Sequence, residues 1–326
     1  MSDELAAPTG VVEKPRTKTK AFKPRERNEN WAFVAFVGPL VLGLVIFVFI
    51  PITWGFIISF FQARVTFAPV GFVGLDNYTN LLNDPEFTRS LGTVIVFAIF
   101  IVPITVLGSL MLAVLVNSIK LGKGFFRSAF FIPTACSYVV ASLIWRMSIF
   151  NGLAYGPANQ ILINVFNANK VAWIGPVNPP LYWVVIVTAR LWLQLGFFMI
   201  ILLAGLQEIP KELYEAARVD GAATGWQTFR NITLPGLRNA LISVLLLNLI
   251  MAFQAFDEFY NILKGPTPTS GNLNAARTPL IYLYQTAFGS HDFGKGAAGG
   301  FILSVIIIVF TIVQGRLLGF GRHDAS

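Results

Sequence analysis

The sequence predicts an all-α membrane protein, a polytopic bundle of six transmembrane helices. Three observations carry this prediction: the composition, the long apolar segments and the distribution of basic residues. Of the 326 residues, 55% are hydrophobic and only 12% are charged, about half the charged fraction of a soluble domain. The mean hydropathy is +0.66. Too few polar side chains remain to cover a soluble globule, so most of the surface is expected to face lipid.

The first 30 residues are polar and contain seven Lys and Arg residues among Pro, Thr and acids. No apolar face recurs in this segment, so we expect residues 1–30 to be a disordered basic tail. The apolar run that begins at Trp31 is too long for the core of a secretory signal. We therefore expect it to be a retained membrane helix.

Six apolar segments approach or exceed the roughly 20 residues that cross a bilayer. The predicted spans lie near 31–60, 91–118, 125–149, 181–206, 237–258 and 298–318. Pro39 and Pro51 predict kinks in the first span, which is also long for a simple crossing. Pro133 interrupts the third, as a helix bundle can tolerate.

The basic residues fall mainly on one side of these spans. Sixteen of the 24 Lys and Arg residues lie in the two termini and in the loops after the second and fourth spans, against six on the opposite side. The positive-inside rule then places both termini in the cytoplasm. The loops near 62–90, 150–180 and 259–297 are expected outside. The protein is thus expected to be a multi-pass protein of a bacterial inner (cytoplasmic) membrane.

Few residues suit catalysis or metal binding. The chain has one Cys and two His, too few for a disulfide framework or a structural His/Cys zinc site. Residues 289–296 approach a phosphate-binding loop, but Gly296 replaces the Ser or Thr that would hold Mg²⁺ and no strand precedes them. We therefore predict no catalytic, metal or cofactor site, and expect another chain to handle ATP.

The informative polar segment is the cytoplasmic loop 207–235, which reads as two short helices. Pro210 suits a first helical position, and Asp220-Gly221 supplies a turn. The residues from Thr224 to Gln227 have capping-box spacing, and Pro235 should end the second helix. An apolar stripe recurs on this helix at helical spacing, formed by Ala222, Trp226, Phe229 and Ile232 or Thr233. It favours either docking to a partner or packing on the membrane or under the bundle.

The same loop resembles a known family. Glu215-Ala216-Ala217, Gly221, and Ile232 followed by Leu234-Pro235 reproduce the EAA…G…I.LP signature of permease subunits of binding-protein-dependent ABC importers. The runs IPKELYEAARVDGA and WQTFRNITLP are similar to the carbohydrate-uptake branch, and the likeness covers nearly the whole chain after the tail. Asn239 stands where a second Pro is common, a departure that affects the start of the fifth span.

This resemblance implies an ABC type I importer permease-like transmembrane domain over residues 31–326. It also implies that the loop couples to an ATPase through Glu215, Ala216, Ala217, Asp220 and Gly221. The implied partners are a second permease subunit, two copies of a cytoplasmic ATPase and an extracytoplasmic substrate-binding protein. The chain would form half of the translocation path for a sugar or oligosaccharide.

Four polar residues at membrane depth are candidates for the substrate path. Gln254 and Glu258 stand four apart on one predicted helical face, with Asp257 beside them. Arg190 lies within the fourth span and is expected to pair with one of these acids or to face the path. The alternative is an interfacial position for the acids and a helix-pairing role for Arg190.

Other functions remain open on the sequence alone. Arg190, Asp257 and Glu258 could serve as the ion relay of a secondary transporter. A permease for a glycerophosphate or another polar solute would carry the same loop. A membrane-embedded enzyme is disfavoured, because the spans hold no paired His, Cys or carboxylate site. The EAA loop favours the ABC importer, because a secondary transporter has no use for it.

Overall fold

The computed structural model describes residues 26–176, 178–221, 225–264 and 273–319. The chain divides into two units, Met1–Thr53 and Trp54–Ser326.

The first unit holds most of one long apolar helical run. Helix α1 (Glu26–Leu44) continues through a π-helical turn, Val45–Phe49, into α2 (Ile50–Ile58), whose last residues belong to the second unit. The apolar stretch Phe33–Ile58 is long enough to cross a membrane. The widened turn lies just before Pro51, which has no N–H to donate to the preceding turn. Pro39, by contrast, lies inside α1 without a break.

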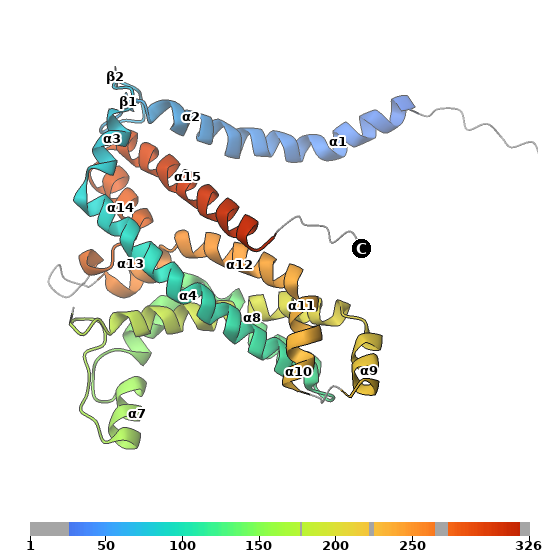
Figure 1. Cartoon of the computed structure of the whole chain (residues 1–326). Helices are drawn as coiled ribbons and strands as arrows, with labels where there is room; N and C mark the ends of the chain where they lie inside the picture. The colour runs from blue at the N-terminus through green and yellow to red at the C-terminus, as the bar shows by residue number, and fades with distance from the viewer. Residues whose placement is uncertain (1–25, 177, 222–224, 265–272, 320–326) are drawn as a thin grey trace, which may run out of the picture. The chain divides into compact units, whose positions relative to one another are not determined.

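The second unit is a helical bundle with one small hairpin (Figure 1). Its helices are α3 (Asp76–Leu82), α4 (Pro85–Ser118), α5 (Lys123–Phe131), α6 (Tyr138–Ile144), α7 (Pro157–Phe166), α8 (Tyr182–Glu208), α9 (Lys211–Val219), α10 (Trp226–Thr228), α11 (Leu234–Gly236), α12 (Arg238–Phe253), α13 (Asp257–Leu263), α14 (Pro279–Tyr284) and α15 (Phe293–Leu317). Strands β1 (Phe61–Gln62) and β2 (Gly71–Phe72) pair antiparallel. Shorter 3₁₀ turns cover Ile132–Ala135 and Leu273–Ala275, and π turns cover Trp145–Ile149, Phe229–Thr233 and Gln285–Gly289.

The number of membrane spans agrees with the sequence prediction. In the described part of the chain, four helical stretches are long and apolar enough to cross a membrane: Phe33–Ile58, α4, α8 and α15. Two bent pairs pass the same test together, which makes up to six spans. The six-span all-α membrane fold is therefore confirmed.

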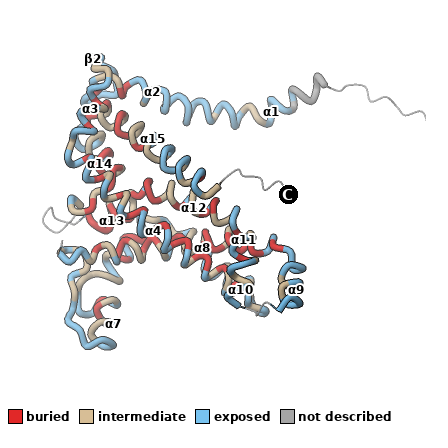
Figure 2. The backbone as a smooth tube through the Cα atoms, in the orientation of Figure 1, coloured by how far each residue is buried: buried red, intermediate tan, exposed pale blue. Residues whose placement is uncertain are grey.

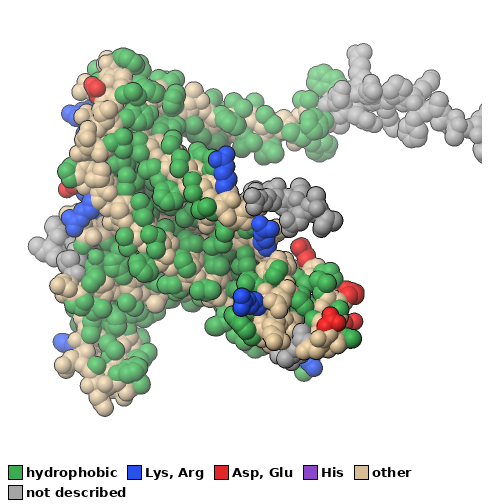
Figure 3. Space-filling model, in the orientation of Figure 1, with side chains coloured by type: hydrophobic (Ala, Val, Ile, Leu, Met, Phe, Trp, Pro, Cys, Tyr) green, Lys and Arg blue, Asp and Glu red, His purple; other side chains and the backbone are tan. Residues whose placement is uncertain are grey.

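The core of the second unit lies where α4 packs along α8 and α12 packs on α4 (Figure 2). Phe97 and Ile101 on α4 and Phe198 and Leu202 on α8 are almost fully buried there. Large apolar side chains cover most of the face of the second unit shown in Figure 3, whereas acidic side chains gather around α9. Lipid or partner chains must cover such an apolar exterior, because water does not solvate it favourably.

The third predicted span is bent rather than continuous, which corrects the expectation of one interrupted helix. Residues Lys123–Ala135 and Tyr138–Ile149 meet at 93°. Pro133 lies in the 3₁₀ turn after α5, and Ser137 caps the new helix α6 by accepting from the N–H of Val139 at 3.3 Å. A proline followed by an N-cap residue ends one helix and begins another.

The fifth predicted span also differs from expectation, because it is not one helix over 237–258. Helix α12 ends at Phe253, and α13 begins at Asp257 after an irregular Phe256 with φ −136° and ψ −60°. Pro235 does not end the preceding helix, since it lies inside α11. The bend there comes between α11 and α12, at 68°.

The sixth predicted span begins earlier than the expected residue 298. Helix α15 starts at Phe293, where the Asp292 side chain accepts from the N–H of Lys295 at 3.1 Å. Residues 293–296 of the glycine-rich stretch 289–296 therefore belong to α15 rather than to a loop. Asp292 also pairs with Arg64 at 3.0 Å, which ties the chain after β1 to the start of α15.

A polar network joins the start of α4 to α14. The Tyr282 hydroxyl donates to Asp84 at 2.6 Å, and Arg277 donates to Glu86 at 2.6 Å and to Gln285 at 3.1 Å. Burial, reinforced by the hydrogen bond to Asp84, raises the pKa of Tyr282 to about 12. Burial alone would raise the pKa of Asp84, but hydrogen bonds from Tyr282 and from backbone N–H groups outweigh it and lower that pKa.

A close approach of two backbones supplies the first prediction. A Cβ atom on Gly196 of α8 would overlap the carbonyl oxygen of Phe130 on α5. We expect Gly196→Ala to push these helices apart and to destabilise the protein by about 1 to 3 kcal/mol, measured by thermal unfolding in detergent. Gly92→Ala is the control, since nothing lies within 4 Å of the added carbon. Equal melting temperatures for the two variants would contradict the close packing.

Candidate functional site

The loop between α8 and α12 forms a compact structure at one end of the second unit (Figure 1). Pro210 is the N-cap residue of α9 rather than its first residue. The helix ends at Val219, and Asp220 and Gly221 close its last turn through hydrogen bonds to Ala216 and Arg218. Gly221 has φ +79°, which glycine adopts without the strain of a side chain. The chain thus turns at the glycine that the sequence marks.

The second helix of the loop begins at Trp226. Residues 222–224 lie outside the described residues, so the expected capping role of Thr224 and the first position of the apolar stripe are not placed. The N-cap residue is Gly225, with φ +131° and no side-chain bond. The helix runs on through the π turn Phe229–Thr233 into α11.

The apolar stripe on this helix divides between two environments. Phe229 and Ile232 pack against the bundle core, which agrees with the second possibility, packing under the bundle. Trp226 remains 71% exposed, and its ring stacks on Phe229 at 5.6 Å. The exposed indole of Trp226 and the exposed Val219 form an apolar edge on the loop.

The five predicted coupling residues lie together on α9 and the turn that follows it. Glu215, Ala216, Asp220 and Gly221 are exposed, and Ala217 is half-buried. Apart from its chain neighbours, no described residue has a heavy atom within 4 Å of a Cβ built on Gly221. This part of the loop therefore presents two carboxylates and several small residues to the outside.

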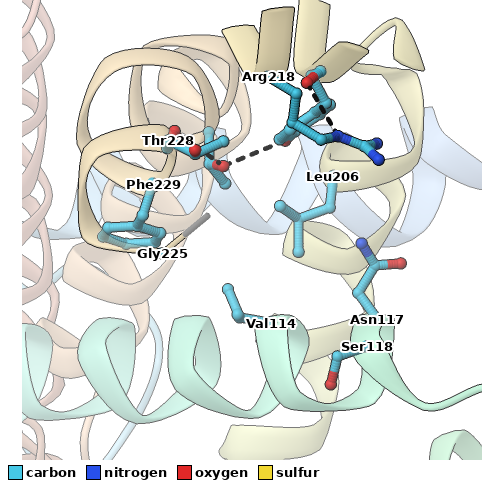
Figure 4. A pocket seen from close by; sticks show the side chains of 10 residues that line it. Val114, Asn117, Ser118, Leu206, Arg218, Gly225, Thr228 and Phe229 are labelled. Carbon is cyan, nitrogen blue, oxygen red and sulfur yellow. Dashed lines mark hydrogen bonds between the residues drawn. The ribbon is translucent and has the colours of Figure 1, made fainter. Parts of the chain in front are cut away.

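Two cavities separate this loop from the ends of α4 and α8. One, of about 400 Å³, is lined by Val114, Asn117, Ser118, Leu206, Tyr214, Arg218, Gly225, Thr228, Phe229 and Thr233 (Figure 4). The other, of about 570 Å³, shares Tyr214 and Arg218 and adds Lys211 and Glu215. The two helices of the loop are joined across the first cavity by a hydrogen bond of 3.1 Å between the Tyr214 hydroxyl and Thr233 Oγ1.

The four predicted path residues also meet, at the break between α12 and α13. Arg190, Gln254, Asp257 and Glu258 line one cavity of about 130 Å³, together with Tyr138, Met251 and Phe256. The reason for this meeting is not the predicted one. Gln254 directly follows α12 and Glu258 lies in α13, so they do not share one helical face.

Arg190 is the centre of this site and is 3% exposed. Its guanidinium pairs with Glu258, 1% exposed, and donates through Nη2 to the backbone carbonyl of Met251 at 2.6 Å. The guanidinium carbon also lies 5.4 Å from the ring centroid of Tyr138 and 5.8 Å from that of Phe97, within cation–π range. The expected pairing of Arg190 with an acid of the fifth span is therefore present, and the acid is Glu258.

Sequence reasoning missed several residues of the site. Tyr138 and Met251 line the cavity, yet each lies in an apolar segment where nothing local distinguishes it from a core residue. Phe256 also lines the cavity, and its ring stacks on that of Tyr260 with centroids 5.2 Å apart. Within the described residues, no group of three or more His, Cys, Asp or Glu side chains could hold a metal ion.

The buried ion pair generates the second prediction. Removing one partner leaves an uncompensated charge in a low-dielectric interior, at a cost of about 3 to 5 kcal/mol. We therefore expect Glu258→Ala to lower the unfolding midpoint in detergent strongly, and the double variant Arg190→Met, Glu258→Leu to recover much of that loss. Arg64→Ala is the control, because that side chain is 61% exposed in its pair and such pairs contribute about 1 kcal/mol or less. A double variant no more stable than Glu258→Ala would contradict the pairing energetics.

The chain matches known proteins over most of its length. Residues 82–318 match the family described as binding-protein-dependent transport system inner membrane component. The chain is 36% identical over 286 residues to the arabinooligosaccharides transport system permease protein AraP of Bacillus subtilis (strain 168), covering 87% of each chain. It is 32% identical over 305 residues to the trehalose/maltose transport system permease protein MalF of Thermococcus litoralis, covering 93% of this chain and 98% of that protein.

A solved structure supports the fold. The chain resembles a protein of the bacterial alginate ABC transporter solved in complex with an alginate pentasaccharide-bound periplasmic protein, with a TM-score of 0.75 and 21% identity. The match covers 89% of this chain and 94% of that one. With the family match extending from α3 to α15, this chain belongs to the family of binding-protein-dependent transport system inner membrane components.

Proposed function

We propose that this chain is one of two permease subunits of an ABC importer for a sugar or oligosaccharide. Two copies of a separate ATPase would power it, and an extracytoplasmic binding protein would deliver the substrate. The observation that carries the proposal is the loop after α8, where the EAA residues and Gly221 lie exposed on one short helix and its turn. The names of the relatives, permeases for arabinooligosaccharides and for trehalose and maltose, support a carbohydrate substrate.

The loop can pass movement to the membrane helices because its parts are joined to one another. The Tyr214–Thr233 hydrogen bond holds α9 against the π turn before α11, and Arg218 Nε donates to the Tyr214 carbonyl at 3.4 Å. Residues 226–236 then lead directly into the 68° bend and α12. A tilt of α9 by an ATPase would therefore reach α12 through a short, continuous run of helix.

We place the substrate path beside the break that ends α12. Gln254 and Asp257 carry most of the direct polar contacts, because the charges of Arg190 and Glu258 already neutralise one another. Arg190 Nε has no hydrogen-bond partner among the described residues, although it is buried. A buried donor next to a cavity calls for a polar occupant such as water or a sugar hydroxyl. Arg190 and Glu258 hold the wall of the path in place.

The proposal also covers the orientation of the chain in the membrane and its division into a tail and a transmembrane domain. Both termini and loop 207–235 are cytoplasmic, in a bacterial inner membrane, as the distribution of Lys and Arg favours. The transmembrane domain covers residues 31–326 and follows the basic segment 1–30, whose last five residues are not disordered as expected but already belong to α1. A secondary transporter is disfavoured, because the Arg190–Glu258 pair is closed and buried rather than exposed to exchange.

The third prediction tests the coupling loop. An aspartate at position 221 would strain a turn at φ +79° and crowd a close partner. We expect Gly221→Asp to reduce both co-purification of the ATPase and sugar uptake at least tenfold, while the protein still inserts in the membrane. Gly122→Asp is the matched control, since Gly122 has φ +75° and open space but lies outside the loop. Normal assembly and uptake with Gly221→Asp would rule out docking at this turn.

A second comparison within α9 separates the docking face from general charge effects. Glu215→Ala should impair uptake, whereas Glu212→Ala, another exposed acid of the same helix, should have little effect. Equal uptake by the two variants would argue against a specific role for Glu215.

The fourth prediction concerns orientation. In a Cys136→Ser background, Gln160→Cys should react with a membrane-impermeant maleimide added outside intact cells, because loop 150–180 is external. Gln207→Cys should react only after the membrane is opened. Both side chains are exposed in the structure. The opposite pattern of labelling would invert the topology.

A further inference from the structure

The wall of the cavity at the α12–α13 break contains more negatively than positively charged side chains. One guanidinium and two carboxylates line it, from Arg190, Glu258 and Asp257. The positive charge of Arg190 is balanced by Glu258 and is held between the rings of Phe97 and Tyr138. The charge of Arg190 is therefore already matched before Asp257 is counted.

Asp257 has no such partner in the described part of the chain. Its backbone carbonyl accepts from Asn261 Nδ2 at 2.8 Å, but no hydrogen bond or ion pair reaches its carboxylate. The residue is half-buried, and its side chain lines the cavity beside the exposed Gln254. A carboxylate in this position faces the space that a passing solute would occupy.

Other cations near this element lie at its opposite end. Arg146 donates to the backbone carbonyls of Asn261 and Lys264, and Lys264 Nζ contacts the Tyr260 hydroxyl at 2.7 Å. The carbonyls that Arg146 contacts belong to residues four and seven positions after Asp257, about 6 to 10 Å along the helix axis. Neither Arg146 nor Lys264 is among the residues that line the cavity. The wall of the cavity therefore carries a net charge of one negative unit.

We infer that Asp257 makes this path select against acidic sugars and admit uncharged ones. The inference rests on the proposed function and adds the chemical class of the substrate. Like charges repel most strongly where low-dielectric walls restrict screening, so a uronate or other acidic sugar meets a barrier here that a neutral sugar does not. Neutral hydroxyl groups can instead donate to the same carboxylate.

The charge of the cavity can be measured without any sugar. In the full complex, Gln254→Cys in a Cys136→Ser background places one thiol in the cavity wall. The rates of its reaction with a positively charged and a negatively charged methanethiosulfonate reagent report the local potential. We expect the cationic reagent to be favoured, and Asp257→Asn to lower the cation-to-anion rate ratio about tenfold.

The matched control removes a carboxylate elsewhere. Asp76 is exposed in the first turn of α3 and does not line the cavity, so Asp76→Asn should leave the rate ratio unchanged. An unchanged ratio with Asp257→Asn would overturn the inference. Failure of both reagents to reach residue 254, with or without ATP, would also overturn it, because the residue would then lie outside an aqueous path.

A transport measurement then tests selection itself. Uptake is compared for a neutral oligosaccharide and for the same sugar oxidised to the aldonic acid at its reducing end, each saturating the binding protein. We expect Asp257→Asn to raise the acid-to-neutral uptake ratio several-fold, and an unchanged ratio would overturn the inference. Absence of ATP-driven uptake of either sugar in the parent complex would instead contradict the proposed function, while the rate-ratio measurement would still stand.

Discussion

The buried guanidinium of Arg190 is the constraint on which the central part of the bundle depends. A charge 3% exposed among apolar helices needs a counter-ion and hydrogen-bond acceptors close by. Glu258 supplies the first and the Met251 carbonyl the second. Because the Met251 carbonyl accepts from Arg190, it departs from the regular hydrogen bonding of the helix. At the same break, Thr278 Oγ1 donates to the Ala255 carbonyl at 2.8 Å. The irregular turn between α12 and α13 is thus stabilised from outside by side chains of α8 and of the segment before α14.

The same break connects the two candidate sites mechanically. At one end of α12 lies the bend that leads from the EAA loop, and at the other lies the cavity bounded by Gln254 and Asp257. A helix bounded at both ends by breaks in the regular structure can tilt as a rigid body against α4, on which it packs. In a long, unbroken fifth helix, Gln254 and Glu258 would instead move together. The orientation of the cavity wall relative to α12 could then not change.

The sequence predicted the six spans and the turn at Gly221 well, because hydropathy, helix length and glycine conformation are local properties. It predicted the bend near Pro133 only in part, since a proline marks a break but not its angle of 93°. The break after Phe253 carried no local signal, because no Gly or Pro lies between residues 253 and 257. It follows from contacts with Arg190 and Thr278, which are distant in sequence. Gln254 and Glu258 do lie beside Arg190, as the sequence suggested. The helical face assigned to them was wrong, because nothing local marked the break that separates them.

The order of residues along the chain has a consequence for biogenesis. Arg190 leaves the ribosome 68 residues before its partner Glu258. Helix α8 must therefore enter the bilayer with an unmatched charge, at about 2.5 to 3.5 kcal/mol on translocon insertion scales. Its surrounding Leu, Ile and Phe residues offset that cost, but the helix gains its final position only when α13 arrives. Until residue 258 has been synthesised, α8 has no counter-ion for Arg190. The ion pair in this way makes the packing of the fourth span depend on completion of the fifth.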